Sequence, residues 1–178
     1  MSSLEDLPSW PVRQLVDAIG STDHAPGDGA AGGVTIALAA ACALKAIVIT
    51  LKHAPDDADL EARAARLQRI AEAALDGAAG DAVAFAALID AHQLPKDSAS
   101  DSAAREAAIR ERTARITRVG VELRALAIEV RSIAEAVRPA ITPTMANDIG
   151  AAIVLATAGE KIQDDNIRES RGVSGQGA

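Results

Sequence analysis

The segment from Ala30 to Leu51 constrains the fold more than any other part of this sequence. It is apolar throughout, Lys45 is its one charged residue, and Ala and Gly fill about half of it. Alanine is the best helix former and fills the core of a sheet sandwich poorly, and small side chains let helices pack closely. The segment is long enough to span a bilayer, but a central lysine would cost roughly 2.5–3.5 kcal/mol there. We therefore expect a buried central helix in an all-α protein.

Apolar periodicity and turn signals divide the chain into about five helices, which predicts an antiparallel helical bundle. Ser9 and Pro11 open the first helix, Pro95 ends the third, and Gly77 and Gly80 break or kink that third helix. The expected ranges are 10–19, 30–51, 55–94, 103–137 and 146–168. The chain of 178 residues is then a single domain over 1–168 with a flexible tail over 169–178.

The fourth expected helix is unusually long for a chain of this size. At 1.5 Å per residue it extends roughly 50 Å, whereas a compact domain of this length has a radius of gyration of only about 16 Å. Either this helix bends near Gly120, or the domain is elongated.

Composition narrows the classes of function. Acidic residues outnumber basic ones by 25 to 18, which gives a formal charge of −7, and Trp10 and Phe85 are the only aromatic side chains. The chain thus lacks the positive surface and the stacking side chains that nucleic-acid binding needs. Cys42 is the only cysteine, which excludes an intrachain disulfide. The acidic start of the chain does not resemble a signal peptide, so we expect a cytoplasmic protein that does not enter a membrane.

Three separated segments carry family-like motifs. The first is a Pro-Gly-Gly-Gly-type loop before a small-residue helix, here residues 26–29 followed by AAGGVTIALAAACAL. The second is an Asp-x-x-x-Phe helix before a Leu-Pro-Lys turn, here Asp81, Phe85 and residues 94–96. The third is a helix start at residues 147–152 with a later Asn-Ile pair at 166–167. Their order and spacing resemble those of the formiminotetrahydrofolate cyclodeaminase and methenyltetrahydrofolate cyclohydrolase family over about residues 10–168.

This resemblance implies a cyclodeaminase-like helical fold, usually dimeric, with a site for a tetrahydrofolate that carries a one-carbon bridge. Family members hydrolyse methenyltetrahydrofolate or close formiminotetrahydrofolate with loss of ammonia. Either reaction moves a proton near an amidine-like carbon and needs an anion beside its positive charge. A tetrahydrofolate derivative and a second copy of the chain are therefore the expected partners. The three histidines are scattered, so we expect no metal.

The chain also departs from the family pattern. Asp28 replaces the middle glycine of the loop, Ala30 replaces a small hydroxyl residue, and His92 replaces a tyrosine. The basic stretch after the apolar helix is reduced to residues 52–53, and acidic residues occupy the last helix at positions 160, 164 and 165. We interpret the chain as a diverged member.

Three residues are candidates for catalysis. Asp148 matches the family's aspartate and starts a helix, where exposed N–H groups stabilise a carboxylate. Asp81 matches the second motif, and the alternative is a simple helix cap after the Gly77–Gly80 break. His92 titrates near neutrality and could act in place of the family's tyrosine, or lie on the surface as a helix-end histidine.

The candidates for ligand binding come from the motifs and from unusual charges. Lys45, alone in an apolar helix, must reach solvent, shift its pKa or pair with a carboxylate, and Glu160 and Asp164 are possible partners because they share one helix face. The other candidates are Pro26, Gly27, Asp28 and Gly29 of the loop, Lys96 of the turn and Asn147 of the last helix. The loop precedes a helix N-terminus that could offer N–H groups to an anion, although it lacks the Gly-Lys-Ser/Thr of a nucleotide-binding loop.

The leading hypothesis is a folate-dependent one-carbon enzyme of the cyclohydrolase or cyclodeaminase type. One alternative is a diverged homologue that transfers the carbon of methylenetetrahydrofolate to another substrate in a Mannich-type reaction. Another is a catalytically silent helical binding or scaffold subunit. Convergence of Asp148, Asp81 and the glycine loop on one pocket would favour the enzyme.

Overall fold

The computed structural model describes residues 3–53 and 55–175, of which residues 173–175 are described by their backbone alone. Every regular element in this part of the chain is helical. The α-helices are α1 (Val12–Ile19), α2 (Asp28–Leu51), α3 (Ala58–His92), α4 (Ala99–Val137) and α5 (Ala146–Gly175), and the short 3-10 helices are Leu4–Ser9, Arg138–Ala140 and Pro143–Met145.

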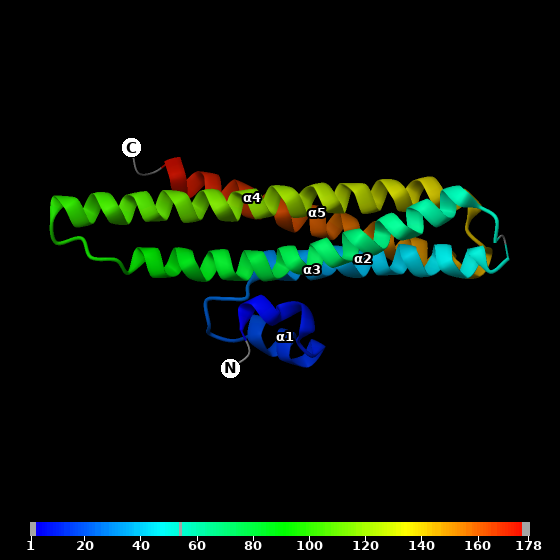
Figure 1. Ribbon diagram of the computed structural model, residues 1–178, viewed down its shortest axis with the longest axis horizontal. Helices are drawn as coiled ribbons and strands as arrows, with labels where there is room; N and C mark the ends of the chain where they lie inside the picture. Colours follow the sequence, from blue (N-terminus) through cyan, green and yellow to red (C-terminus); the bar gives the residue numbers. More distant parts are fainter. Residues whose placement is uncertain (1–2, 54, 176–178) are drawn as a thin grey trace.

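Helices α2 to α5 form an elongated four-helix bundle in which successive helices run antiparallel (Figure 1). Helix α2 packs against α3 and α5, and α4 packs against the same two helices from the other side. Short α1 lies outside the bundle, next to the N-terminus (Figure 1). The sequence-based prediction of an all-α antiparallel bundle is confirmed.

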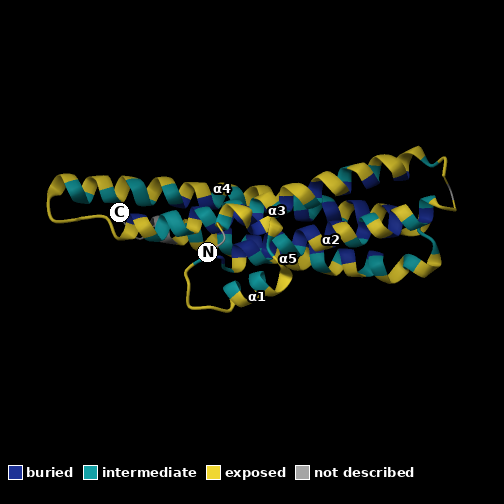
Figure 2. Ribbon diagram, turned by 60° about the horizontal axis from the view of Figure 1, so that its bottom comes forward, coloured by how far each residue is buried: buried dark blue, intermediate teal, exposed yellow. Residues whose placement is uncertain are grey.

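Helix α2 is the central helix, as its composition predicts. Ile36 and Ile47 on it are fully buried, and alanines occupy most of the positions between them that face the core. By length and composition α2 could cross a membrane, and it is the one such helix in the part of the chain that the structure describes. Its contacts with α3, α4 and α5 give its apolar side a protein partner, and buried residues concentrate where these helices face one another (Figure 2).

Small residues bring α2 and α3 into close contact. A Cβ atom added to Gly33 would lie 2.8 Å from the Cβ atom of Ala78 and 3.0 Å from the carbonyl oxygen of Ala74. Two backbones can approach this closely only where side chains are nearly absent. The alanine-rich core is therefore a set of close helix contacts.

Helix α3 is continuous from Ala58 to His92, so of the two outcomes predicted at Gly77 and Gly80, a break or a kink, the break is wrong. A Cβ atom on Gly77 would lie 2.6 Å from Cδ2 of Leu123 on α4, which shows that this glycine accommodates a neighbouring helix. Glycine costs a helix about 1 kcal/mol relative to alanine, and the packing of α3 against two neighbours outweighs that cost. Asp57 caps the helix start by accepting a hydrogen bond from Leu60 N at 3.0 Å.

Helix α4 runs the length of the bundle without a break (Figure 1), so the elongated alternative holds. It starts at Ala99, four residues before its predicted start, because Ser98 caps it and accepts a hydrogen bond from Asp101 N at 3.1 Å. Arg66 of α3 donates two hydrogen bonds of 2.6 Å to the carboxylate of Glu129 on α4. This two-point ion pair fixes the register of α3 against α4.

The N-terminal prediction needs a correction. Residues 4–9 form a 3-10 helix, α1 starts only at Val12, and Ser9 does not cap it because its hydroxyl donates to Asp6 O. The apolar side of α1 is only partly covered, since Val12 and Val16 are 78% and 61% exposed. Leu15 of α1 packs against a small core cluster of α2 and α3 residues, which also includes the buried Leu7 of the 3-10 helix.

The C-terminal prediction also needs a correction. Helix α5 continues to Gly175, whereas we expected a flexible tail from residue 169. Glu169 and Ser170 of the added turns line a cavity together with residues of α3 and α4. Residues 176–178 of the predicted tail lie outside the described residues.

Candidate active site

The N-terminus of α2 is the foundation of the site. The N-cap residue, Gly27, supplies no side-chain hydrogen bond, so the first N–H groups of α2 depend on other helices. The carboxyl group of Asp81 on α3 accepts a hydrogen bond from the backbone of Ala30. Asn166 on α5, with its amide nitrogen turned toward Asp28, accepts from Gly29 N at 3.3 Å and donates to Asp28 Oδ2 at 2.7 Å. Side chains from α3 and α5 thus cap α2 from outside.

Glycine at position 29 allows the carboxyl group of Asp81 to lie close to the backbone at the start of α2. A Cβ atom at this position would overlap the carboxyl group of Asp81. From the other side, the fully buried Gln163 of α5 donates its Nε2 hydrogen to Gly29 O at 3.1 Å. The start of α2 is therefore held between α3 and α5.

Asp81 is a buried carboxyl group, only 6% exposed. Burial raises the pKa of Asp81 to about 6, repulsion from Asp28 adds to this increase, and the hydrogen bond from Ala30 opposes it. Near neutral pH such a group can both accept and return a proton, which general acid–base catalysis requires.

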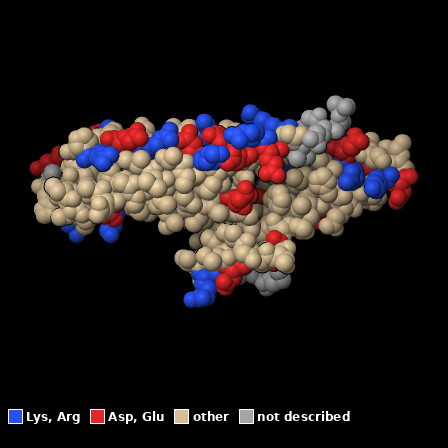
Figure 3. Space-filling model, turned by 180° about the vertical axis from the view of Figure 1, so that it is seen from behind, with Lys and Arg blue, Asp and Glu red and all other residues tan. Residues whose placement is uncertain are grey.

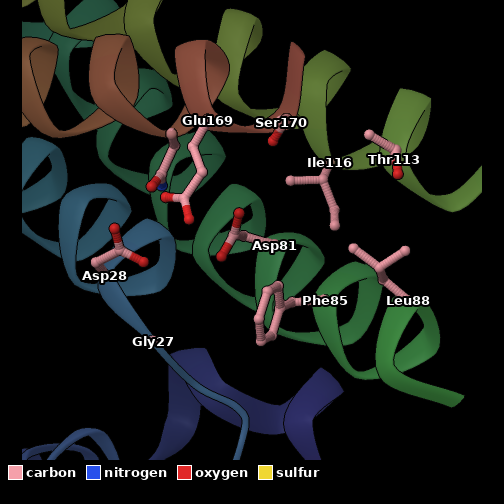
Figure 4. A pocket seen from close by; sticks show the side chains of 10 residues that line it. Gly27, Asp28, Asp81, Phe85, Leu88, Thr113, Ile116, Glu169 and Ser170 are labelled. Atoms are coloured by element: carbon pink, nitrogen blue, oxygen red, sulfur yellow. The ribbon is translucent and has the colours of Figure 1, made fainter. Parts of the chain in front are cut away.

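A cavity of about 200 Å³ opens beside Asp81, between the start of α2 and helices α3, α4 and α5. In Figure 4 the carboxylate of Glu169 points from α5 toward Asp28 and Asp81. The lining residues are Gly27, Asp28, Asp81, Phe85, Leu88, Thr113, Ile116, Asn166, Glu169 and Ser170. One end of the cavity is therefore acidic and the other is mostly apolar.

The charged residues that line this cavity determine which kind of ligand it favours. Three lining residues carry carboxyl groups, and none of the lining residues is Lys or Arg. A low-dielectric cavity with this charge favours a cation or a group that becomes positive during a reaction. Among the described residues no group of three or more His, Cys, Asp or Glu is arranged to hold a metal ion, and the expected absence of a metal stays a prediction.

Asp148 and Lys45, both predicted from sequence, lie elsewhere. Lys45 Nζ is 3.6 Å from Asp148 Oδ1, and this pair lies near the opposite end of α2 from the site. Seventeen residues separate Asp28 from Lys45, which corresponds to about 25 Å along the helix. The structure brings Asp81 and the glycine loop together and leaves Asp148 apart from them, so the expected convergence of all three on one pocket is wrong.

Glu160 and Asp164 also differ from expectation, because neither pairs with Lys45. Glu160 contacts Arg124 at 3.6 Å and Arg131 at 2.5 Å, and Asp164 contacts Arg124 at 2.5 Å. These ion pairs join α5 to α4 and lie outside the lining of the cavity. Arg124 and Arg131 of α4 are thus part of a helix–helix contact.

The remaining candidates lie outside the cavity. His92 is exposed at the end of α3, and its carbonyl oxygen accepts hydrogen bonds from Arg105. Lys96 is exposed in the following loop and Asn147 in the first turn of α5. Pro26 is buried and lines a second hollow beside Trp10. Of the predicted site residues, the structure gathers Gly27, Asp28, Gly29 and Asp81.

Sequence reasoning missed several residues of the site. Asn166 is part of a quoted motif but is not a predicted ligand contact, Gln163 is not singled out, and Glu169 falls in the predicted tail. A signal exists, because Gln163, Asn166 and Ser170 recur at intervals of three and four residues and so share one helix face. Thr113 and Ile116 of α4 carry no comparable signal.

Fold and site together define an all-helical protein with an acidic cavity built around the N-terminus of its central helix. The family model described as Formiminotransferase-cyclodeaminase matches residues 11–167, and the chain belongs to this family. The resemblance inferred from the sequence motifs is therefore confirmed.

Two relatives illustrate the similarity. The chain is 28% identical over 151 residues to the methenyltetrahydrofolate cyclohydrolase of Methylorubrum extorquens, covering 83% of this chain and 73% of the relative. Its fold is similar to that of formiminotetrahydrofolate cyclodeaminase from Thermotoga maritima, with a TM-score of 0.80 and 18% identity over 92% of this chain and 79% of the other. At that identity the second similarity concerns the fold alone.

Proposed function

We propose that this protein is a tetrahydrofolate-dependent one-carbon enzyme that hydrolyses the methenyl bridge of methenyltetrahydrofolate. The bridge is an amidine-like cation, and the relatives named above act on a methenyl or formimino tetrahydrofolate according to their names. The observation that carries the proposal is the buried carboxyl of Asp81, whose pKa is raised to about 6 and which lines an acidic cavity.

In the first step, Asp81 acts as a base. Its carboxylate takes a proton from a water molecule while the water oxygen forms a bond to the bridge carbon, which yields a neutral carbinol between the two folate nitrogens. The negative charges of Asp28 and Glu169 stabilise the cationic substrate and position it. Near neutral pH, Asp81 is largely ionised and ready for this step.

In the second step, Asp81 acts as an acid. It returns its proton to one bridge nitrogen as the bond between that nitrogen and the carbon breaks. The hydroxyl oxygen loses its proton to solvent and becomes the carbonyl of a formyl group. One water is consumed and one proton is released.

The same arrangement suits cyclodeamination, because closing a formimino group also transfers a proton, from the attacking nitrogen to the departing ammonia. Mannich-type transfer would need a second substrate, and no described residue of the cavity supplies a carbon or nitrogen nucleophile. A silent scaffold subunit is less consistent with an acidic cavity around a carboxyl of raised pKa. Hydrolysis remains our first choice.

The test follows the absorbance of methenyltetrahydrofolate with and without protein. Asp81→Asn should lower kcat at least a hundredfold, as expected when a general acid–base group is removed. Asp76→Asn, on an exposed position of the same helix, is the matched control and should retain activity. No acceleration by the wild-type protein, together with no calorimetric binding of a reduced folate, would refute the proposal. Acceleration of formimino closure alone would select the cyclodeaminase.

We also propose that two copies pair through the outer face of α2 and α5. Leu38 and Val48 of α2 and Val154 of α5 are 54%, 43% and 67% exposed. Figure 3 shows the side of the bundle opposite to that of Figure 1, where most charged side chains lie along one edge and a broad uncharged area remains. Light scattering should give twice the monomer mass, and Leu38→Glu should reduce it to one copy. A monomeric wild-type protein would contradict this proposal.

We propose that the protein is located in the cytoplasm and that it binds neither nucleic acid nor membranes. A formal charge of −7 opposes binding to phosphate backbones and anionic lipids, and a single cysteine suits a reducing compartment. Cell fractionation with compartment markers tests the location, and recovery in the membrane fraction would contradict it.

A further inference from the structure

Thr113 on α4 is a buried polar side chain that the proposed chemistry does not use. It is 4% exposed, and its hydroxyl oxygen has no hydrogen-bond partner among the described residues. Thr117 and Thr157 behave differently, since each donates to the carbonyl four residues earlier, at 3.0 and 2.8 Å. Leaving a buried hydroxyl unpaired is costly, so the exception at Thr113 points to a missing ligand atom.

The position of Thr113 connects it with the reaction centre. It lines the same cavity as Asp81, together with Phe85 and Leu88 of α3 and Ile116 of α4. Figure 4 shows Asp81 at one side of this group and Thr113 beyond Ile116 and Leu88. The cavity therefore runs from a carboxyl, through an apolar section, to the hydroxyl of Thr113, and Ser170 of α5 also lines it.

The two ends of the cavity fit different parts of a tetrahydrofolate. A pterin ring presents several N–H donors along its pyrimidine edge, and carboxylates such as those of Asp28 and Glu169 accept from such groups. The benzoyl ring presents two apolar faces and, beyond them, one amide carbonyl. The hydroxyl of Thr113, at the end of the apolar section, can satisfy that carbonyl but not the several donors of a pterin edge.

We infer that Thr113 determines how the folate lies in the cavity: its hydroxyl donates a hydrogen bond to the benzoyl amide carbonyl, with the benzoyl ring between α3 and α4 and the pterin at the acidic end. This inference rests on the proposed function, because it assumes a folate with its one-carbon bridge at Asp81. It assigns substrate selection to α4, on which sequence analysis placed no candidate residue.

The experiment compares Thr113→Val with Thr113→Ser and with the matched control Thr157→Val. Thr113→Val keeps the shape of the side chain and removes the hydroxyl, so KM for methenyltetrahydrofolate should rise about three- to tenfold with little change in kcat. Thr113→Ser should restore KM to near the wild-type value, and Thr157→Val should not change it. Melting temperatures of all three variants show whether each is folded.

Two fragments identify the end of the folate that Thr113 contacts. The inhibition constant of p-aminobenzoylglutamate should rise with KM in Thr113→Val, whereas that of 6-methyltetrahydropterin should stay constant. An unchanged constant for the benzoyl fragment, or an equal rise for the pterin fragment, would overturn the inference. Failure of the proposed function gives a different result, because the wild-type protein itself would then neither hydrolyse methenyltetrahydrofolate nor bind a reduced folate.

Discussion

The carboxyl group of Asp81 occupies the space in which a side chain of residue 29 would begin, so Gly29 and Asp81 fit together as one unit. This contact allows a carboxyl on α3 to reach the backbone N–H of Ala30, at the start of α2. It also buries the carboxyl, which keeps its pKa near 6. Close backbone approach thus produces the acid–base group.

Gly29→Ala should disrupt this contact. The added methyl group overlaps the Asp81 carboxyl, and overpacking of this kind costs about 1–3 kcal/mol. Urea unfolding should show this loss, and catalytic activity should fall because Asp81 is displaced. Gly150→Ala is the control, since nothing lies within 4 Å of its added Cβ atom, and it should stabilise α5 by up to about 1 kcal/mol. Equal stability of Gly29→Ala and wild type would contradict the described contact.

Asp81→Asn should stabilise the fold above pH 6. In the wild-type protein the pKa of Asp81 is raised from 3.8 to about 6, so below pH 4 both folded and unfolded chains hold the proton. As pH rises to 6 the unfolded chain releases it first, and stability falls by up to about 3 kcal/mol. The variant lacks this loss, while its amide oxygen can still accept from Ala30. The unfolding free energies of the variant and the wild type, measured at pH 4, 6 and 8, should differ more as the pH rises. A constant difference between the two proteins would refute the raised pKa of Asp81.

Catalysis should depend on the ionisation of Asp81. Because its carboxylate is the base in the first step, kcat/KM should rise with pH up to about 6 and then level off. Asp28→Asn removes a repulsive charge that contributes to the raised pKa of Asp81. The midpoint of the pH profile of kcat/KM should therefore lie at lower pH in this variant than in the wild type. Asp76→Asn should leave the midpoint in place. Initial rates, corrected for uncatalysed hydrolysis at each pH, provide the measurement.

Glu160→Gln should affect stability and not substrate binding. Glu160 is only 16% exposed and contacts both Arg124 and Arg131, so loss of its charge should destabilise the protein by about 1–2 kcal/mol. KM should stay constant because Glu160 lies outside the cavity. The control is Glu106→Gln, whose exposed pair with Arg110 should contribute little. A raised KM with unchanged stability would instead support the folate-binding role predicted from sequence.

Helix positions were predictable wherever the determining signal is local. The apolar run of α2 and the proline after α3 each act within a few residues. Gly77 and the end of α5 were not predictable, because Leu123 on another helix makes the glycine necessary and Glu169 and Ser170 line a cavity that other helices share. Intrinsic propensity is weak beside such packing.

The residues of the candidate site also fall into those that the sequence predicted and those that it did not. The glycine loop and Asp81 were identified from motifs, and the structure places them together. The separation of Asp148 from that pair was not predictable, since sequence order gives no distance across a bundle. Asn166 and Thr113 acquire their significance only from their neighbours on α2 and α3.

By itself the sequence determined that the chain is helical, that its core is built from small residues and that it belongs with the cyclodeaminase-type proteins. These properties follow from periodicity, propensity and short motifs, all of which act locally along the chain. Only the tertiary structure decided which carboxyl is buried, which hydroxyl lacks a partner and where the cavity lies. A pKa or an unsatisfied hydrogen bond depends on distances between residues far apart in sequence, and only the packing of the helices sets those distances.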